Sequence, residues 1–589
     1  MVKKILFLFL MMFASFLMAQ NVAITGTVTD ANGEPLIGVN VVVKGTSTGA
    51  ITDLNGAFTV NGKQGDVLVF TYIGMESQEI AFRGTPLRVS MKDDSQALDE
   101  VVVVGYGSQK KVNLTGSVAT VDFSDETLSR PVTTVASALS GMVAGLNVMQ
   151  TSSKPNSESS SIKIRGTGTL NDSSPLILVD GMEMDLNNVN PNDVASISVL
   201  KDAASCAIYG NRGANGVILV TTKKGSDGKI NVSYSGKFSY NTPAKLNRMV
   251  SNYADYMEFI NEASDNAGEA SVFAQTTIDQ WREAEKNPNG ISESGYPNYV
   301  AFPNTDWYDA VYNPKWMQEH SITLTGAEKR TRYSLSATYI NNPGLVVNSG
   351  MKKYYMRSNI ESQVTNFLAV GLNAWGYHTD QERNDVDALN GLQMQKSTPG
   401  TYPYYDGKYG SPEALEEDPV AANPAYFLNN SDGYYKTTKF FVNPYIKIDF
   451  LKDFHLTSNF YYDHYRAEHL WHNSDYRERF SFQRGETMNT PPTSDILEEY
   501  TVKSYYDGNQ SWKNTTTLNW EHLFAKKHDV NVLLGYEEYR KWSRTTDISK
   551  KGMLDTSLID FDALTEPDYI SGGSTEFSSR SWFGRVSYA

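Results

Sequence analysis

The sequence predicts a mainly β protein built from several parts, and three observations support this prediction. Residues 21–91 carry short β-type runs separated by turn signals. Beyond residue 229, segments of about ten residues alternate apolar and polar side chains, and a glycine-punctuated α/β stretch lies between the two regions. Because 589 residues are too many for one ordinary domain, we expect a small β-sandwich, an α/β unit and a large antiparallel sheet, in that order.

The N-terminal stretch MVKKILFLFLMMFASFLMA is typical of an export signal. Lys3 and Lys4 precede an apolar run from Ile5 to Met18, which is too short to span a bilayer as a helix, and Ala19 offers a small residue for cleavage. We therefore predict that residues 1–19 are a signal peptide and that the mature protein is exported. No cysteine follows the signal, which argues against a lipid anchor at the new N-terminus.

The single cysteine, Cys206, rules out an intramolecular disulfide and a cysteine-cluster metal site. It lies in an alanine-rich stretch, so we expect a small buried helix residue.

Residues 20–91 are predicted to form the small β-sandwich. Its β-type runs include VAITGTVTD and DVLVFTYIG, and Asn55-Gly56 and Asn61-Gly62 favour tight hairpin turns. The stretch TDLNGAF at 52–58 resembles the start of a calcium loop, but it lacks the further carboxylates and the final glutamate, so we predict a plain turn. Residues 92–111 then form a polar, acidic linker that contains the segment DEVVVVGYG.

Four consecutive valines in this linker leave two structures open. Valine strongly favours an extended strand, and apolar groups on both faces would suit a strand buried in the sandwich or in the α/β unit. Gly105 and Gly107 would instead leave a hinged segment that adds as an edge strand to a partner's sheet. The residues alone do not decide between these two structures.

Residues 229–589 are predicted to form a transmembrane barrel. Short connections alternate with long ones that are rich in Tyr, Asn, Asp, Gly and Pro, and this rhythm is typical of an outer-membrane barrel rather than of a secreted β-sandwich array. The ten predicted strands lie near 230–240, 319–328, 331–340, 353–362, 367–377, 439–450, 454–464, 513–524, 529–540 and 577–589. The short connections are Lys329-Arg330, 363–366, 451–453 and 525–527, and the long ones include 241–318, 378–438, 465–512 and 541–576.

Charge and motif content exclude several classes of function. The net charge of −15, with no offsetting basic patch, argues against nucleic acid as a partner. The sequence contains no nucleophile elbow or P-loop, and the histidines of EHLWH at 468–472 lack the order of a zinc-protease motif. We expect that pentapeptide to lie in a long surface loop, and we predict a protein that is not an enzyme and has neither cofactor nor metal site.

Residues 112–228 carry the most specific signal in the chain. They contain SIKIRGTGTLNDSSPLILVDGMEMD and then NPNDVASISVLKDAASCAIYGNRGANGVILVTTKKG. Over about a hundred residues this region closely resembles the plug domain of the SusC/RagA family of TonB-linked outer-membrane transporters. The motif residues that carry the resemblance are Arg165, Gly166, Asp180, Gly181, Lys201, Asp202, Tyr209, Gly210, Arg212, Gly213, Asn215 and Gly216.

The resemblance implies a domain order and an incomplete barrel. Residues 20–91 look like the carboxypeptidase-regulatory-like domain that precedes the plug in this family, 112–228 look like the plug, and 229–589 look like barrel. A plugged transporter has about 22 strands, and ten are too few to enclose a plug of this size. We therefore expect the chain to cover roughly half of the barrel.

The resemblance also suggests roles for individual plug residues. Arg165 and Arg212 each lie near a glycine, and the family implies that such arginines pair with glutamates of the barrel wall and lock the plug; the alternative is a surface arginine of little consequence. For Asp180-Gly181 and Asn192-Asp193 we expect turn and capping roles.

For the four valines, the resemblance favours docking of TonB by strand addition. The predicted docking residues are Asp99, Glu100, Val101, Val102, Val103, Val104, Gly105, Tyr106 and Gly107. The implied function is import of a nutrient, glycan or peptide, across the outer-membrane lipid, with TonB on the periplasmic side and a SusD-like lipoprotein as a lid. The alternative from another class is an exported adhesin without transport. The tyrosine-rich stretch 400–410 could contact sugar or peptide equally well.

Overall fold

The computed structural model describes residues 22–588 apart from several short stretches, and these form two compact units, 1–115 and 116–589. The predicted signal peptide and Asp99, Glu100, Gly105 and Tyr106 of the predicted docking segment lie outside the described residues. The stretches not described are 31–32, 47, 73–74, 76, 93–100, 105–106, 111–117, 124–133, 151–153, 156–159, 226–229, 244–247, 383–396, 413–422, 430, 474–477, 489–496, 526 and 554–556.

The first unit contains the predicted β-sandwich. One sheet has the order β4-β1-β7, the other has the order β3-β2-β5-β6, and apolar side chains of both sheets share one buried core that includes Ile24, Val41 and Phe70. The strands are β1 (Val22–Thr29), β2 (Asn40–Val43), β3 (Gly49–Ile51), β4 (Ala57–Gly62), β5 (Val67–Thr71), β6 (Gln78–Ala81) and β7 (Leu87–Ser90).

Two turn predictions in the sandwich have different outcomes. The plain turn at 52–58 is confirmed, because the Asp53 carboxylate accepts hydrogen bonds from the backbone N–H groups of Asn55 and Ala57. The turn at Asn61-Gly62 is wrong, because both residues belong to β4 and pair with β1. A side chain at Gly62 would lie 2.7 Å from the Ile24 side chain, so this glycine serves close packing rather than a turn.

The valine run forms a strand in a separate hairpin. β8 (Val101–Val104) pairs antiparallel with β9 (Gly107–Lys110), and the two make a sheet of their own. The polar residues after the valines were expected to continue the linker, but Ser108 to Lys110 are the partner strand. Among the described residues, the second edge of β8 pairs with no other strand.

The α/β stretch folds into a compact domain, here called the plug (residues 118–222). Its five-stranded sheet has the order β10-β15-β16-β13-β14, in which only β13 and β16 are parallel, and β11 and β12 form a separate pair. The elements are β10 (Val118–Asp122), α3 (Val135–Ala138), β11 (Leu146–Gln150), β12 (Ser160–Ile164), β13 (Leu176–Val179), β14 (Met182–Glu183), η2 (Leu186–Asn188), η3 (Pro191–Asp193), β15 (Val194–Leu200), α4 (Ala203–Cys206), η4 (Ala207–Gly213) and β16 (Val217–Thr222).

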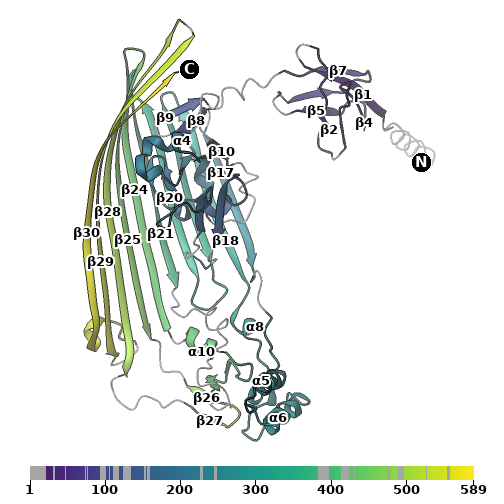
Figure 1. The fold of residues 1–589 in the computed structure, drawn as a ribbon, viewed down its shortest axis with the longest axis vertical. Coiled ribbons are helices and arrows are strands. Elements are labelled where there is room, and N and C mark those ends of the chain that lie inside the picture. Colours follow the sequence, from purple (N-terminus) through teal and green to yellow (C-terminus); the bar gives the residue numbers. More distant parts are fainter. Residues whose placement is uncertain are drawn as a thin grey trace, which may run out of the picture. The chain divides into compact units, whose positions relative to one another are not determined.

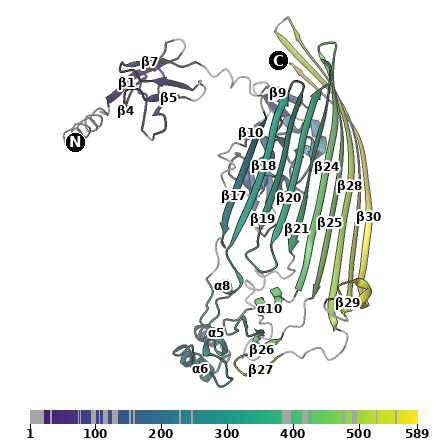
Figure 2. The same ribbon diagram turned by 180° about the vertical axis from the view of Figure 1, so that it is seen from behind.

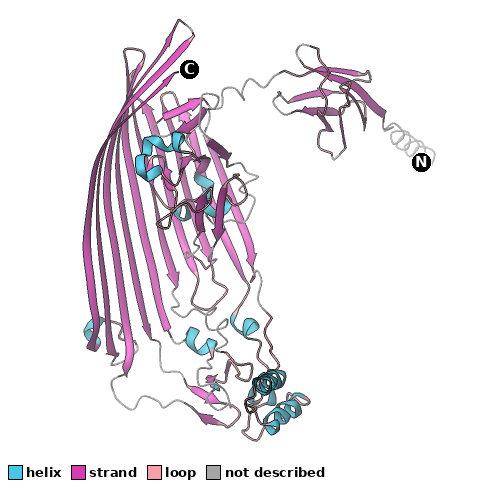
Figure 3. Ribbon diagram, in the orientation of Figure 1, coloured by secondary structure: helices cyan, strands magenta, loops and turns pink. Residues whose placement is uncertain are grey.

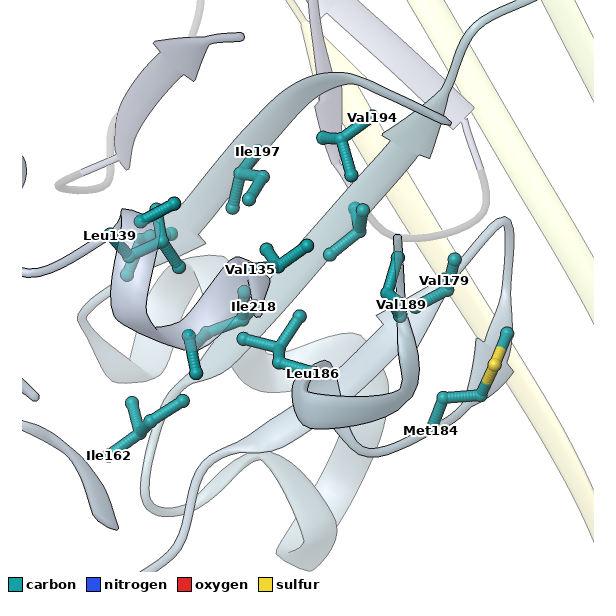
Figure 4. Packing of buried hydrophobic residues seen from close by; sticks show 14 of the residues in the cluster. Val135, Leu139, Ile162, Val179, Met184, Leu186, Val189, Val194, Ile197 and Ile218 are labelled. Carbon is teal, nitrogen blue, oxygen red and sulfur yellow. The ribbon is translucent and has the colours of Figure 1, made fainter. Parts of the chain in front are cut away.

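The plug has an apolar core (Figure 4), and the wall contributes Phe441 of β24 and Tyr461 of β25 to the same cluster. Side chains of α3, η2 and the central strands meet there, and Val135, Leu186 and Ile197 are fully buried. Cys206 is buried on α4, as expected. The run VILVTT coincides with β16, which confirms that a continuous apolar run marks a central strand.

The ten predicted long strands all exist and form one antiparallel sheet, here called the wall. Their spatial order follows the sequence from β17 to β30, and Figures 1 and 2 show a curved sheet with the plug against its inner face. The strands are β17 (Asn231–Asn241), β18 (Lys315–Glu328), β19 (Thr331–Asn342), β20 (Met351–Gln363), β21 (Leu368–Glu382), β24 (Ser431–Phe450), β25 (Phe454–Asn473), β28 (Leu497–Phe524), β29 (His528–Met553) and β30 (Leu564–Tyr588).

The outer face of the wall carries large exposed apolar side chains. On β24, Phe440, Ile446 and Phe450 are exposed, whereas Phe441 and Asn443, which point the other way, are buried. This period-two pattern is the one predicted from the sequence. No helix among the described residues combines the length and hydropathy needed to cross a membrane.

Several wall strands are longer than predicted. β28 has 28 residues and β29 has 26, whereas about 9–11 residues suffice to cross a bilayer. The pentapeptide at 468–472 therefore lies within β25, paired on both sides, and not in a loop as expected. Outside the apolar band, both faces of a strand can be polar. The alternation of apolar and polar residues then ends, although the backbone hydrogen bonds to the neighbouring strands continue.

Three long connections pack together at one end of the wall and form the loop cap (residues 252–312, 397–412, 423–429 and 478–488). Figure 3 shows its helices and short strands beyond the ends of the long strands. The cap contains α5 (Tyr253–Ala267), α6 (Gln275–Glu285), α7 (Asn298–Ala301), α8 (Trp307–Val311), α10 (Pro424–Asn429) and a four-stranded sheet of β22 (Tyr404–Tyr405), β23 (Lys408–Gly410), β26 (Arg479–Ser481) and β27 (Glu486–Thr487). A short helix, η6 (Phe561–Ala563), precedes β30.

Candidate functional site: the contact between plug and wall

The tight turn η3 brings the plug against wall strands β18 and β19. Asn190, not Asn192 or Asp193, caps this turn through its side-chain oxygen, and its amide group donates to Thr338 Oγ1 at 2.8 Å. Asn192 Nδ2 donates to Glu319 Oε1 at 2.6 Å. The predicted capping role of Asn192-Asp193 is therefore wrong, because both side chains contact the wall.

Asp193 is a buried carboxylate at this contact. Its Oδ1 accepts a hydrogen bond from Ser336 Oγ at 2.6 Å. Burial raises the pKa of Asp193 above its ordinary value, and the nearby Arg357 guanidinium opposes that rise. The plug thus presents a partly compensated buried charge to the wall.

A second contact surrounds the turn between β13 and β14. Asp180 and Gly181 both have positive φ, as the predicted turn requires. The Asp180 carboxylate accepts hydrogen bonds from the backbone N–H and the hydroxyl of Thr222, and that hydroxyl also accepts one from Arg357 of the wall. Asp180 is therefore a turn residue that also organises a link to the wall.

Gly181 lies directly against the wall. Its carbonyl accepts a hydrogen bond of 2.6 Å from Lys513 Nζ on β28, and a Cβ at this position would lie 2.8 Å from the Tyr461 hydroxyl on β25. Lys513 is almost fully buried and lies 3.7 Å from Glu537 of the neighbouring strand. A residue larger than glycine would therefore separate the two parts.

The charges at the contact are arranged differently from the prediction. Arg212 pairs with Glu183, which belongs to the plug and not to the wall. Arg165 has positive φ and an exposed side chain, and it makes no ion pair with any described residue. The cations at the contact come from the wall, as Lys237, Arg357 and Lys513, and the acceptors come largely from the plug.

Most of the other predicted motif residues gather elsewhere, around one hollow of about 330 Å³ on the plug. Asp202 caps α4, Lys201 donates to the Ala144 carbonyl and Asn215 donates to the Asp172 carbonyl. Tyr209 lies on η4, half-buried. The predicted residues that line the hollow are Arg165, Gly166, Lys201, Asp202, Gly210, Gly213, Asn215 and Gly216.

Sequence reasoning missed the wall residues Arg357 and Lys513 and the plug residues Asn190 and Thr222. Arg357 carried a usable signal, because it occupies an inward position on a strand whose outward face includes Tyr354, Met356 and Ile360. Lys513 carried a weaker one, because Asn514 as well as Trp512 points outward beside it. Asn190 and Thr222 carried no such signal, since polar residues at strand and turn boundaries are common. No group of three or more potential metal ligands occurs among the described residues.

A plug with an apolar core, held by hydrogen bonds and by Phe441 and Tyr461 against a curved wall with an apolar outer face, defines the class of plugged outer-membrane receptors. Comparison with known proteins agrees with this class. A family model described as a CarboxypepD_reg-like domain matches residues 24–103, and one described as the TonB-dependent Receptor Plug Domain matches 110–217.

Curated relatives and solved structures identify the family. The chain is 32% identical over 587 residues to the TonB-dependent receptor P26 of Formosa agariphila, covering 96% of this chain and 54% of that protein. It is 34% identical over 432 residues to the TonB-dependent receptor SusC of Bacteroides thetaiotaomicron, covering 71% of this chain and 39% of that protein.

The structure of the RagAB peptide importer in its open-open state superposes with a TM-score of 0.68 at 24% identity, covering 83% of this chain and 55% of that one. The chain belongs to the SusC/RagA type of TonB-dependent receptors, and it spans about half the length of the curated relatives that it matches.

Proposed function

We propose that this chain serves in an outer-membrane importer that takes up a nutrient and draws its energy from TonB. The observation that carries the proposal is the hydrogen-bonded contact between a plug with an apolar core and a wall whose outer face is apolar. Such a wall suits lipid, and a plug that is held by exchangeable polar contacts can leave its position when it is pulled. The similarity to SusC and to the RagAB importer supports the same function.

The proposed handle for TonB is the segment 99–107. β8 is an extended strand, and one of its edges pairs with no other described strand, so a partner strand could add there through main-chain hydrogen bonds. A SusD-like lipoprotein would close the importer from outside, and the cargo would be a glycan or a peptide. This function does not require the chain to be an enzyme.

A proline substitution in β8 tests the handle. Val103→Pro removes one backbone donor from the strand, whereas Val103→Thr keeps both the donor and a β-branched side chain. We expect V103P to weaken binding of the natural protein to the C-terminal domain of TonB at least tenfold, and V103T to bind as the unmodified protein does. Equal binding of all three proteins in a titration would contradict the handle.

Deletion of residues 99–107 tests the energised step. Without the handle, the protein should still fold and bind cargo at the cell surface, but it should no longer support uptake. Uptake of labelled oligosaccharide or peptide at the normal rate by cells that carry this deletion would rule out the proposed role of TonB. Under that result, surface binding without transport becomes the better account of the protein.

A further inference from the structure

The loop cap contains a hollow that the proposed transport does not use. The hollow has a volume of about 610 Å³ and lies between α6, α7, α8 and the segment 402–404. This volume is within the range of small-molecule sites in proteins. We propose that the hollow is a binding site for a neutral carbohydrate, located in the cap and separate from the contact between plug and wall.

The cap is a packed unit, so the site is already formed without a ligand. Trp281 and Trp307 are fully buried, and their indole N–H groups donate to the carbonyls of Pro303 and Thr398 at 3.1 and 2.8 Å. The backbone N–H of Thr305 donates to the Pro399 carbonyl, which joins two connections that are far apart in the sequence. A ligand would therefore meet rigid walls, and little ordering cost would oppose its binding.

Two tyrosine rings at the hollow are exposed and held in place from behind. Tyr299 is 40% exposed and Tyr404 is 51% exposed. The ring of Tyr404 lies 4.8 Å from that of Tyr409, and the ring of Tyr299 lies 5.9 Å from that of Tyr402. Such rings offer apolar faces of the kind that the C–H faces of a pyranose can cover.

The polar lining supplies both donors and acceptors, which the hydroxyl groups of a sugar require. The amide groups of Asn298 and Asn304 each use one hydrogen within the protein, to the Asn287 carbonyl and to Glu285, and an NH₂ group has a second one. Asp309 is exposed, and its carboxylate makes no hydrogen bond or ion pair with described residues. Amides and carboxylates together suit vicinal hydroxyls.

The charges of the lining select against two other ligand classes. Glu285, Asp306 and Asp309 line the hollow, and no lysine, arginine or histidine is among its described lining residues, so a uronate or sulfated sugar would meet like charge. A cationic peptide would find only one of these three carboxylates without a described partner, that of Asp309, because Asp306 already accepts from two backbone N–H groups of α8 and Glu285 from two asparagine amides. A neutral sugar matches the remaining mixture of groups.

A binding experiment tests this inference. The purified natural protein is applied to an array of neutral and acidic glycans, and calorimetry then measures its affinity for the best neutral glycan. Tyr404→Ala and Tyr299→Ala should each weaken binding at least tenfold, and Asp309→Asn about threefold. Phe259→Ala and Glu262→Gln, at exposed positions of α5 in the same cap that do not line the hollow, are the matched controls and should change nothing. Tyr404→Phe keeps the ring and should bind nearly as well as the unmodified protein, which separates a lost contact from a misfolded cap.

The inference would be overturned if the unmodified protein bound no neutral glycan more tightly than the Tyr299→Ala/Tyr404→Ala double variant does. Preferential binding of acidic glycans, or displacement of the neutral glycan by a short lysine peptide, would also overturn it. The measurement needs no energised membrane. Deletion of residues 99–107 should leave this binding unchanged, so failure of the transport proposal and failure of this inference are distinguishable.

Discussion

The interior of the plug is apolar, whereas its contact with the wall is mixed, because hydrogen bonds join the two parts and Phe441 and Tyr461 of the wall belong to the apolar cluster of the plug. Inside the plug, Val135, Leu186 and Ile197 pack without polar groups (Figure 4). At the wall, Asn192, Asp193 and the carbonyl of Gly181 contact Glu319, Ser336 and Lys513 through hydrogen bonds. Water can replace the hydrogen bonds of the contact, and the apolar cluster lies within the plug except for those two wall side chains, so the plug should keep its fold while it leaves the wall.

The largest expected effect comes from opening a cavity in the plug core. Leu186→Ala removes a fully buried side chain and should cost about 2–5 kcal/mol of plug stability. Urea unfolding, followed by hydrogen exchange of β15 and β16, measures this loss. Exposed Leu170 provides a control, and L170A should leave the midpoint within experimental error. An equal effect of both substitutions would mean that the plug has no core of its own.

A side chain at Gly181 should separate plug and wall without unfolding the plug. Gly181→Val adds a Cβ that would lie 2.8 Å from the Tyr461 hydroxyl, at a φ of 88° that valine rarely adopts. We expect a loss of about 1–3 kcal/mol at the contact. Protease cleavage near 180–193 should become faster in the purified protein.

Gly168→Ala is the matched control for Gly181→Val, because no atom lies within 4 Å of a Cβ built at Gly168. If protease cleaved the two variants at similar rates, the close approach of Gly181 to Tyr461 would be unimportant for the contact.

Loss of the wall cation should weaken the contact to a similar extent. Arg357→Met removes the donor to Thr222 and the positive charge near Asp193, while keeping much of the side-chain volume. About 1–3 kcal/mol is the usual cost of leaving a buried acceptor without its donor. On heating, protease cleavage near 180–193 should begin at a lower temperature in R357M than in the unmodified protein, and an unchanged onset would remove Arg357 from the contact. Arg332, which is exposed and pairs with Glu361 on the same sheet, is the control position.

The smallest effect concerns pH. Because the pKa of Asp193 is raised in the folded protein, its stabilising contribution is fully present below the ordinary aspartate pKa and is lost as pH rises through the raised value. Asp193→Asn cannot titrate but still accepts from Ser336, so the difference in melting temperature between this variant and the unmodified protein should change as pH rises above the ordinary aspartate pKa. A difference that does not depend on pH would mean that Asp193 does not titrate with a raised pKa.

The fold was predictable from the sequence wherever one face of a strand meets an apolar surface. All ten wall strands were predicted, because apolar and polar residues alternate along β24 and its neighbours when one face of the strand meets such a surface. The strand ends were not predictable, since β25 and β28 continue as ladders after the alternation stops. The cap was expected only as long connections, because its packing depends on contacts such as Trp307 to Thr398, between segments distant in sequence.

The contact between plug and wall was less predictable than the fold. Arg212 was expected to reach a wall glutamate, but Glu183 lies within its reach on the plug itself. Pairing between charges depends on distances that a sequence does not contain, whereas the positive φ of Asp180-Gly181 follows from local turn chemistry. The predicted docking role of 99–107 and the predicted locking role of Arg165 remain predictions.

Hydrogen exchange of the purified protein at low urea concentration tests the central claim most directly. The claim is that the plug core and the contact with the wall are separate units of stability. The amides of 180–181 and 190–193 should then exchange at urea concentrations where those of β15 and β16 are still protected. Exchange of all these amides in a single step would contradict the account, because plug and contact would then unfold together.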